Sequence, residues 1–378
     1  MALSQVGLER LNTATTKKIG TSKNLIFNGA MQVAQRGTSS TSIGYQTVDR
    51  FQLRTTGVDA APTQAQVDVA SGTSPYTSGF RKAYKITNGN QTGGAGAGDR
   101  IIINYKFEAQ DIANSGWNYT DPNSFITLSF WVKSSVAQNF FGYVLTQDGT
   151  QQCLPFETGS LSADTWTKIT KTIPGNSNLT FDNNNDSGLE IEWIMFRGTN
   201  FTGSVSLNAW AAFNSSVRTP DNTSTWYTTN SATWELTGVQ VEVGSVATDF
   251  EHKSYGDTLW DCQRYCSQIG RADSGEDIYT LFGLQAYGTS AIFGTIGHWP
   301  RQMRAKPTVT LSGVIQYTNS AAGAVFSPTG GTYNRSTKNS VGSTALSFGS
   351  SLFVQGGFSA AFAATADGAN YIQGDAEL

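Results

Sequence analysis

Residues able to act as nucleophiles or general bases are scarce in this sequence. Histidine occurs only at His252 and His298, and neither has a nearby serine or cysteine in a nucleophile setting such as Gly-x-Ser-x-Gly. The three cysteines, Cys153, Cys262 and Cys266, form no Cys-x-x-Cys or Cys/His spacing of a zinc site. We therefore expect no histidine-dependent hydrolase, no zinc centre, and cysteines that serve as small buried apolar residues.

Paired carboxylates are the remaining route to catalysis, because glycosidases need two acids flanking one bond. The acids with that potential are Glu190 with Glu192, and Asp182 with Asp186. Glu190 and Glu192 share the polar face of a predicted strand over 189–195, opposite its apolar residues. We expect this face to be solvated, and we predict that the protein is not an enzyme.

Clustered Asp and Asn oxygens in FDNNNDSGLEIEW suggest calcium, a hard cation that prefers oxygen ligands. An EF-hand loop starting at Asp182 would place Ser187 at the turn glycine and Trp193 at the bidentate glutamate, so that pattern fails. Two interpretations remain open, a plain Asn-rich turn and a calcium site at the edge of a sandwich. The predicted ligands of that site are Asp182, Asn184 and Asp186.

Aromatic residues beside planar polar side chains give the best indication of a ligand, because sugars stack on aromatic faces and bond to such groups. Two predicted loops, GWNYTDPNS and RTPDNTSTWYTTN, contain this combination. The alternative is that these rings close the open ends of a β sandwich. The candidate ligand-binding residues are Trp117, Tyr119, Asp121, Asn123, Asn222, Trp226 and Tyr227.

The composition is typical of a β-rich extracellular or virion protein. Charged residues make up 14% of the 378 residues, against about 25% in an average domain, and there are 40 glycines. The formal net charge is −3 without a basic cluster, which argues against a nucleic-acid partner. We find no pattern of a signal peptide or of a membrane span, and expect the protein to be made and assembled in a cytoplasm, or released from it by lysis.

Short stretches of alternating apolar and polar residues predict many β strands. The clearest is SFITLSFWVKSS, in which Ile126, Leu128, Phe130 and Val132 face one way, and Thr127, Ser129 and Trp131 the other. Comparable stretches cover 101–107, 141–145, 166–173 and 189–195, and beyond the middle of the chain 278–299 and 307–317. Such a series with almost no helix is typical of a jelly-roll sandwich.

The stretch WELTGVQVEVG changes the parity of its apolar residues. Trp234 and Leu236 face one way, and the valines from Val239 onward can share that face only if one residue is inserted. The sequence therefore predicts a β bulge near Thr237 and Gly238.

A helix is predicted shortly after this strand. Asp257 is a suitable N-cap, and Gly270 stands where a C-terminal glycine belongs. The apolar stripe between them has spacings of three and four residues and consists of Leu259, Cys262, Cys266 and Ile269.

Three phrases carry a resemblance to a known group of proteins. TGVQVEVGSVATDFE followed by LWDCQRYC resembles the junction, found in phage and prophage tail-fibre proteins, between a carbohydrate-binding-module-like jelly roll and a small distal β domain. NLIFNGAMQVAQRG at 24–37 is similar to the first strand of such sandwiches, and WPRQMRAKPTVT at 299–310 to a phrase of the distal domain.

This resemblance implies four parts: an N-terminal attachment segment (1–23), a jelly roll (24–252), a junction helix (253–271) and a distal β domain (272–378). The N-terminal segment would join other tail or virion proteins. The stretch 339–366 has no charged side chain and favours close packing around a three-fold axis, hence a homotrimer.

The sequence thus predicts a virion structural protein, a trimeric tail fibre that adsorbs to host polysaccharide or lipopolysaccharide. The alternatives are a capsid decoration or cement protein and, third, a polysaccharide depolymerase.

Overall fold

The computed structural model describes the backbone at residues 23–269, 278–280, 284–288, 291–295, 298–312, 315–319, 324–326, 330–334, 343–347, 358–359, 362–364 and 371–378. Side chains are described at 23–268, 298–310 and 373–378. The predicted attachment segment (1–23) lies outside these residues except for its last position. The chain forms two units, Met1–Ser254 and Tyr255–Leu378, and each is considered by itself.

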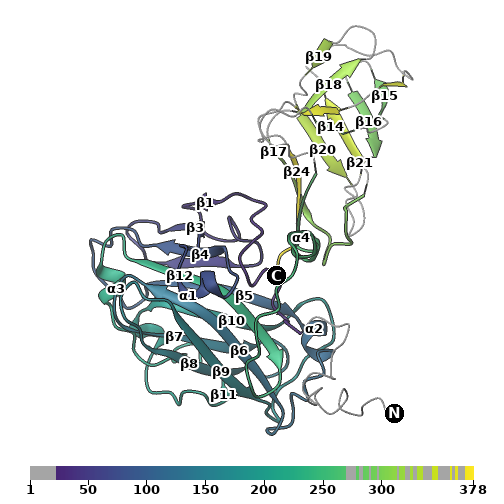
Figure 1. The fold of residues 1–378 in the computed structure, drawn as a ribbon. Helices are drawn as coiled ribbons and strands as arrows, with labels where there is room; N and C mark the ends of the chain where they lie inside the picture. Colours follow the sequence, from purple (N-terminus) through teal and green to yellow (C-terminus); the bar gives the residue numbers. More distant parts are fainter. Residues whose placement is uncertain are drawn as a thin grey trace, which may run out of the picture. The chain divides into compact units, whose positions relative to one another are not determined.

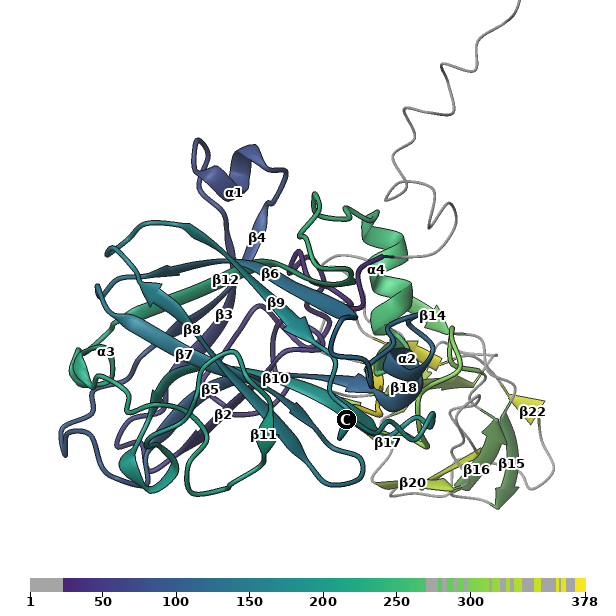
Figure 2. The ribbon, with the colours of Figure 1, turned by 90° about the horizontal axis from the view of Figure 1, so that it is seen from below.

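The first unit is a β sandwich of two antiparallel six-stranded sheets, as the alternating stretches predict (Figures 1 and 2). Sheet A has the order β1 (Ser39–Ser40), β3 (Thr63–Asp68), β4 (Lys82–Thr87), β12 (Thr233–Val243), β6 (Phe125–Ser134) and β9 (Thr167–Pro174). Sheet B has the order β11 (Ala211–Ala212), β8 (Gln152–Ser160), β7 (Asn139–Thr146), β10 (Ser187–Arg197), β5 (Arg100–Glu108) and β2 (Gln52–Thr56).

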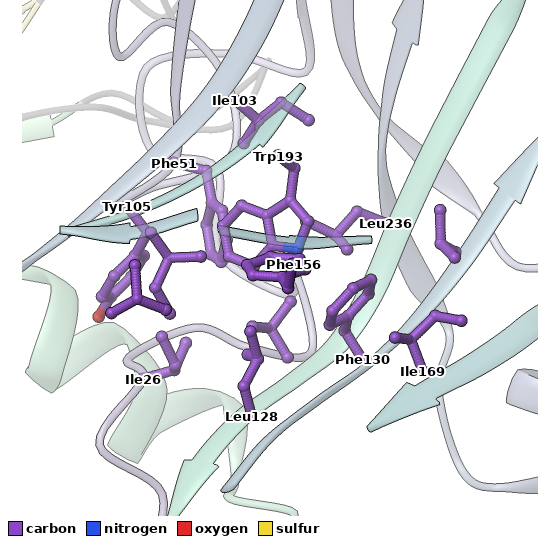
Figure 3. Close-up of a cluster of buried hydrophobic side chains, with 14 of the residues drawn as sticks. Ile26, Phe51, Ile103, Tyr105, Leu128, Phe130, Phe156, Ile169, Trp193 and Leu236 are labelled. Carbon is purple, nitrogen blue, oxygen red and sulfur yellow. The ribbon is translucent and has the colours of Figure 1, made fainter. Parts of the chain in front are cut away.

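The core lies between the two sheets, where side chains of one parity from every long strand meet. Trp193 of β10 is at its centre (Figure 3). Its ring centroid lies 5.9 Å from that of Phe130 on β6 and 6.2 Å from that of Phe51. The predicted inward face of β6 is confirmed, since Ile126, Leu128, Phe130 and Val132 are all buried.

The predicted bulge in β12 is also confirmed. The pairing of β12 with β6 shifts register between Thr237 and Gln240, and Gly238 has φ +62°. This insertion keeps Leu236 and Val239 on the core side, where both are fully buried.

The segment that resembles a first strand forms turns instead. Asn28 and Met31 have positive φ values of 60° and 57°, which no regular strand contains. The segment still bonds to β12, because the Leu25 amide donates to the Val241 carbonyl oxygen at 2.8 Å and the Val239 amide donates to the Gly29 carbonyl oxygen at 2.9 Å.

Helices in the first unit are short. No helix among the described residues is long and apolar enough to cross a bilayer. The helices are α1 (Ser74–Thr77), α2 (Ala109–Ala113), the 3-10 turn η2 (Thr199–Phe201) and α3 (Thr225–Thr228).

The second unit begins with α4 (Tyr255–Cys262), which is shorter than predicted. Cys266 and Ile269, assigned above to the helical stripe, belong to strand β13 (Cys266–Ile269), so the predicted extent of the helix was wrong. Strand β13 pairs with β24 (Tyr371–Asp375), and this pairing with distant residues overrides the helical spacing. All three cysteines are buried, as predicted.

The described strands of the second unit form three antiparallel sheets. Described strands at 278–280, 284–288 and 291–295 fall within the strand region predicted over 278–299, and strands at 308–312 and 315–319 agree with the one predicted over 307–317. The side-chain packing of 339–366 lies outside the described residues. The sheets are β13, β24 and β17 (Thr308–Ser312); β14 (Ile278–Thr280), β23 (Phe362–Ala364), β18 (Ile315–Asn319) and β19 (Ala324–Phe326); and β20 (Gly330–Asn334), β21 (Ser343–Ser347), β16 (Ala291–Thr295), β15 (Leu284–Gly288) and β22 (Phe358–Ser359).

Candidate functional site

The two aromatic loops proposed as ligand sites have their large rings in the core. Trp117, Trp226 and Tyr227 are 3%, 0% and 1% exposed, so no sugar can stack on them, and that prediction is corrected. The Trp226 indole nitrogen donates to the Thr233 carbonyl oxygen at 3.0 Å, which satisfies the buried ring. These rings close the ends of the sandwich, which was the alternative interpretation.

The polar members of these loops hold local turns. The Asn123 amide donates to Asp121 Oδ1 at 2.9 Å, and the Asn222 side chain donates to the Pro220 carbonyl oxygen at 2.9 Å. Tyr119 packs edge-on against a core phenylalanine. Figures 1 and 2 place α2, which precedes the first loop, and α3, which lies within the second, at opposite ends of the sandwich, so the structure does not bring the two loops together.

The calcium prediction stays a prediction. Asp182 and Asp186 are exposed, and Asn184 Oδ1 accepts the Asp186 amide at 2.9 Å in a local turn. Asp148 joins them: partial burial raises its pKa, and the Asp182 and Asp186 charges raise it further. Among the described residues there is no group of three or more His, Cys, Asp or Glu side chains that could hold a metal ion.

Glu190 and Glu192 share one face of β10 as predicted, but this face is not solvated. They are 5% and 1% exposed. Glu192 accepts hydrogen bonds from Arg197 Nη2 at 2.5 Å and Arg54 Nη1 at 3.2 Å. The predicted solvated face was wrong because arginines from β2 and from the end of β10 extend over the sheet. A glycosidic bond cannot reach two acids that lie beneath these side chains.

Glu190 should make stability depend on pH. Burial raises the pKa of Glu190 and the Glu192 charge raises it further, while Lys106, Arg54 and Asn104 oppose the shift. The ionised form is therefore disfavoured in the folded state, and wild-type stability is lost as pH rises through the folded pKa. We expect Glu190→Gln to gain stability relative to wild type from about pH 4 to about pH 7, measured by urea unfolding. A constant difference over that range would contradict the assignment.

His252, which sequence analysis left without a role, lines a pocket on the outer face of sheet A. The pocket has a volume of about 460 Å³. We call it the aromatic pocket. It is lined by Thr77, Ser78, Gly79, Phe80, Ser129, Trp131, Lys168, Gly238, Asp249, Phe250 and His252.

Three rings form one wall of the aromatic pocket. Phe80 lies 4.8 Å from Phe250 and 5.0 Å from His252, and Phe250 lies 4.9 Å from His252, all between ring centroids. His252 Nε2 is 3.0 Å from the Ser78 carbonyl oxygen, which fixes the imidazole orientation. These residues follow α1 and β12, so the wall comes from segments far apart in the sequence.

Strand β6 supplies Trp131 and Ser129, which face away from the core as their parity predicts. The bulge brings Gly238 beneath the pocket. A Cβ at Gly238 would lie 2.6 Å from Phe80 Cζ and 3.0 Å from Trp131 Cδ1, so only glycine allows these two rings to approach. The bulge that restores core parity in β12 thereby also shapes this pocket.

Two side chains of opposite charge complete the aromatic pocket. Lys168 and Asp249 are exposed, and within the described part of the chain neither side chain has a hydrogen bond or an ion pair. An aromatic wall with a few polar groups is the usual composition of a small-molecule site, and hydroxyl-rich ligands use both features. The sequence signal that could have located it was a tryptophan on the solvent side of a central strand.

Comparisons with known proteins give no family: no family model and no curated protein matches. Similar solved structures include the enzymatically active domain of tailspike protein 4 of bacteriophage CBA120 (12% identity, TM-score 0.32, 59% of this chain and 22% of that chain). Another is the N-terminal cellulose-binding domain of Cellulomonas fimi β-1,4-glucanase C (11% identity, TM-score 0.26, 57% of this chain and 99% of that chain). A third is the family 11 carbohydrate-binding module of Clostridium thermocellum (10% identity, TM-score 0.25, 56% of this chain and 98% of that chain). The chain thus spans about a fifth of the tailspike chain.

Proposed function

We propose that this protein is a trimeric virion appendage, a phage tail fibre, that binds host-surface glycan in the aromatic pocket. The observation that supports the site is Trp131, a half-buried tryptophan beside Lys168 and Asp249 in a pocket of about 460 Å³. Sugar rings stack on such a face, and the two charged groups are placed to bond to hydroxyls.

The appendage role rests on the three tail-fibre-like phrases of the sequence. Localisation of the protein on particles by cryo-EM tests this role, and a mass near 40.5 kDa in light scattering would contradict the trimer.

Binding without bond cleavage is the activity that the first unit supports. Glu190 and Glu192 are buried, and Glu192 is held by two arginines. We expect no release of reducing sugar from host polysaccharide, and steady release by the purified protein would replace this proposal with the depolymerase. Weak single-site binding multiplied by several copies is sufficient for adsorption.

Trp131→Ala tests the pocket. After a glycan array identifies the best oligosaccharide, we expect calorimetric titration to show at least about tenfold weaker binding, equivalent to about 1.4 kcal/mol. Loss of one stacking platform accounts for this magnitude.

Trp166→Ala is the matched control. Trp166 also packs on the outer side of sheet A, under the Lys133 ammonium at 5.2 Å, but it does not line the pocket. Its truncation should leave affinity unchanged. Equal affinities of Trp131→Ala and wild type, with both folded by melting analysis, would exclude this pocket as the glycan site.

A further inference from the structure

Four arginines gather on the outer face of sheet B, on the opposite side of the sandwich from the aromatic pocket. Arg54 lies on β2, Arg100 on β5, Arg197 on β10, and Arg218 in the segment after β11. We call them the arginine cluster. Arg100 pairs directly with Arg197 in the β5–β10 register, a like-charge arrangement that is unfavourable unless an anion compensates it.

The protein itself supplies little compensation. Glu192 contacts Arg54 and Arg197. Glu190, on the same face of β10, also interacts electrostatically with Arg54, so two carboxylates stand against four guanidinium groups. Arg100 Nε donates to Thr56 Oγ1 at 2.9 Å, and Arg218 Nε to the Ser215 carbonyl oxygen at 3.1 Å, both uncharged acceptors. Burial lowers the pKa of Arg100, and the charges of Arg54 and Arg197 lower it further.

Buried polar atoms of Arg197 have no hydrogen-bond partner among the described residues. They are Nε and Nη1, and Arg197 is 1% exposed. Folded proteins seldom leave such groups unbonded, and those that do often bind a ligand or ion there.

Solvent reaches the cluster from one side. The Arg54 side chain is 37% exposed, and Arg100 and Arg218 are half-buried. Arg218 lies over the rings of Phe201 and Phe213, at 5.4 and 5.2 Å, which hold the guanidinium in place. Fixed guanidinium groups bind carboxylate and phosphate oxygens in pairs.

We infer that the arginine cluster is a second binding site that takes the carboxylate or phosphate groups of an acidic polysaccharide. Arg54, Arg100 and Arg218 contact the oxyanion, and Arg197 adds charge from below while Glu192 keeps it oriented. The site does not depend on the aromatic pocket, because it occupies the other sheet and shares no residue with it.

Calorimetry with three probes tests this site: oligogalacturonate for carboxylate, its methyl ester as the neutral control, and mannose 6-phosphate for phosphate. We expect wild type to bind one or both anions at least tenfold more tightly than the ester, and to lose this preference between about 20 and about 500 mM sodium chloride. The anion that binds more tightly tells whether the site takes carboxylate or phosphate groups. Equal binding of the ester and both anions would overturn the proposal.

Arg54→Gln/Arg100→Gln should weaken anion binding at least tenfold. Arg81→Gln is the control for loss of an arginine away from the cluster and matches Arg218→Gln in charge, since Arg81 lies near sheet A over the Tyr76 ring at 4.0 Å. It should change affinity less than twofold. If the double variant does not fold, the affinity for anions is measured on Arg218→Gln, because Arg218 lies outside the regular strands. Unchanged affinity in the folded variants, or loss of anion binding in Trp131→Ala, would refute a separate site.

Discussion

Trp193→Ala is expected to lower the free energy of unfolding of the sandwich by about 3 to 5 kcal/mol, the usual range for removing a buried tryptophan. Its ring is 1% exposed and lies between the two sheets, beside Phe51 and Phe130 (Figure 3). Truncation removes contacts to both layers at once. The measurement is urea unfolding followed by tryptophan fluorescence, which reports mainly the first unit because most tryptophans lie there.

Trp193→Phe separates lost packing from lost hydrogen bonding. The Trp193 indole N–H is buried and has no partner among the described residues, so its removal sacrifices no bond. We expect Trp193→Phe to cost much less than Trp193→Ala. Equal costs would mean that the indole nitrogen has a partner, such as an ordered water, and that the core contacts described above are not the main contribution.

Strand parity was the most reliable guide from sequence to fold. It predicted the inward face of β6 and the bulge at Gly238, because a strand with one buried face must keep its apolar residues on that side. Helical spacing was a poorer guide at α4, where Cys266 fits a helical stripe but pairs with Asp375 in a sheet. A partner more than a hundred residues away leaves no local signal.

The binding sites were harder to predict than the fold. Trp131 was assigned correctly to the outer face, yet the wall opposite it comes from Phe80 and Phe250, which no local pattern connects. The loop tryptophan Trp226 has the same composition around it as a sugar site but is fully buried. Likewise, the face of Glu192 followed from periodicity, whereas its burial depends on arginines brought together by the sheet.

Glu192→Met is expected to destabilise the sandwich by about 3 to 5 kcal/mol, because it leaves the Arg197 guanidinium buried without a carboxylate. Burial is the strongest single influence on Arg197 and disfavours its charged form, but the interactions with Glu192 and Tyr143 together outweigh it and raise the pKa of Arg197. The double variant Glu192→Met/Arg197→Met removes both charges and retains similar side-chain volume. The free energy of unfolding of this double variant should lie within about 1 kcal/mol of the wild-type value or above it.

The exposed pair of Lys82 with Asp68 provides the control for this cycle. Its atoms are 2.6 Å apart, as close as those of the buried pair, but both side chains are well exposed. Asp68→Ala should therefore change stability by at most about 1 kcal/mol. If the stability lost in the double variant equalled the sum of the losses in Glu192→Met and Arg197→Met, the coupling energy would vanish, and the cost would come from packing and not from an uncompensated charge. Recovery in the double variant would instead show that the Glu192–Arg197 pair is dispensable for folding.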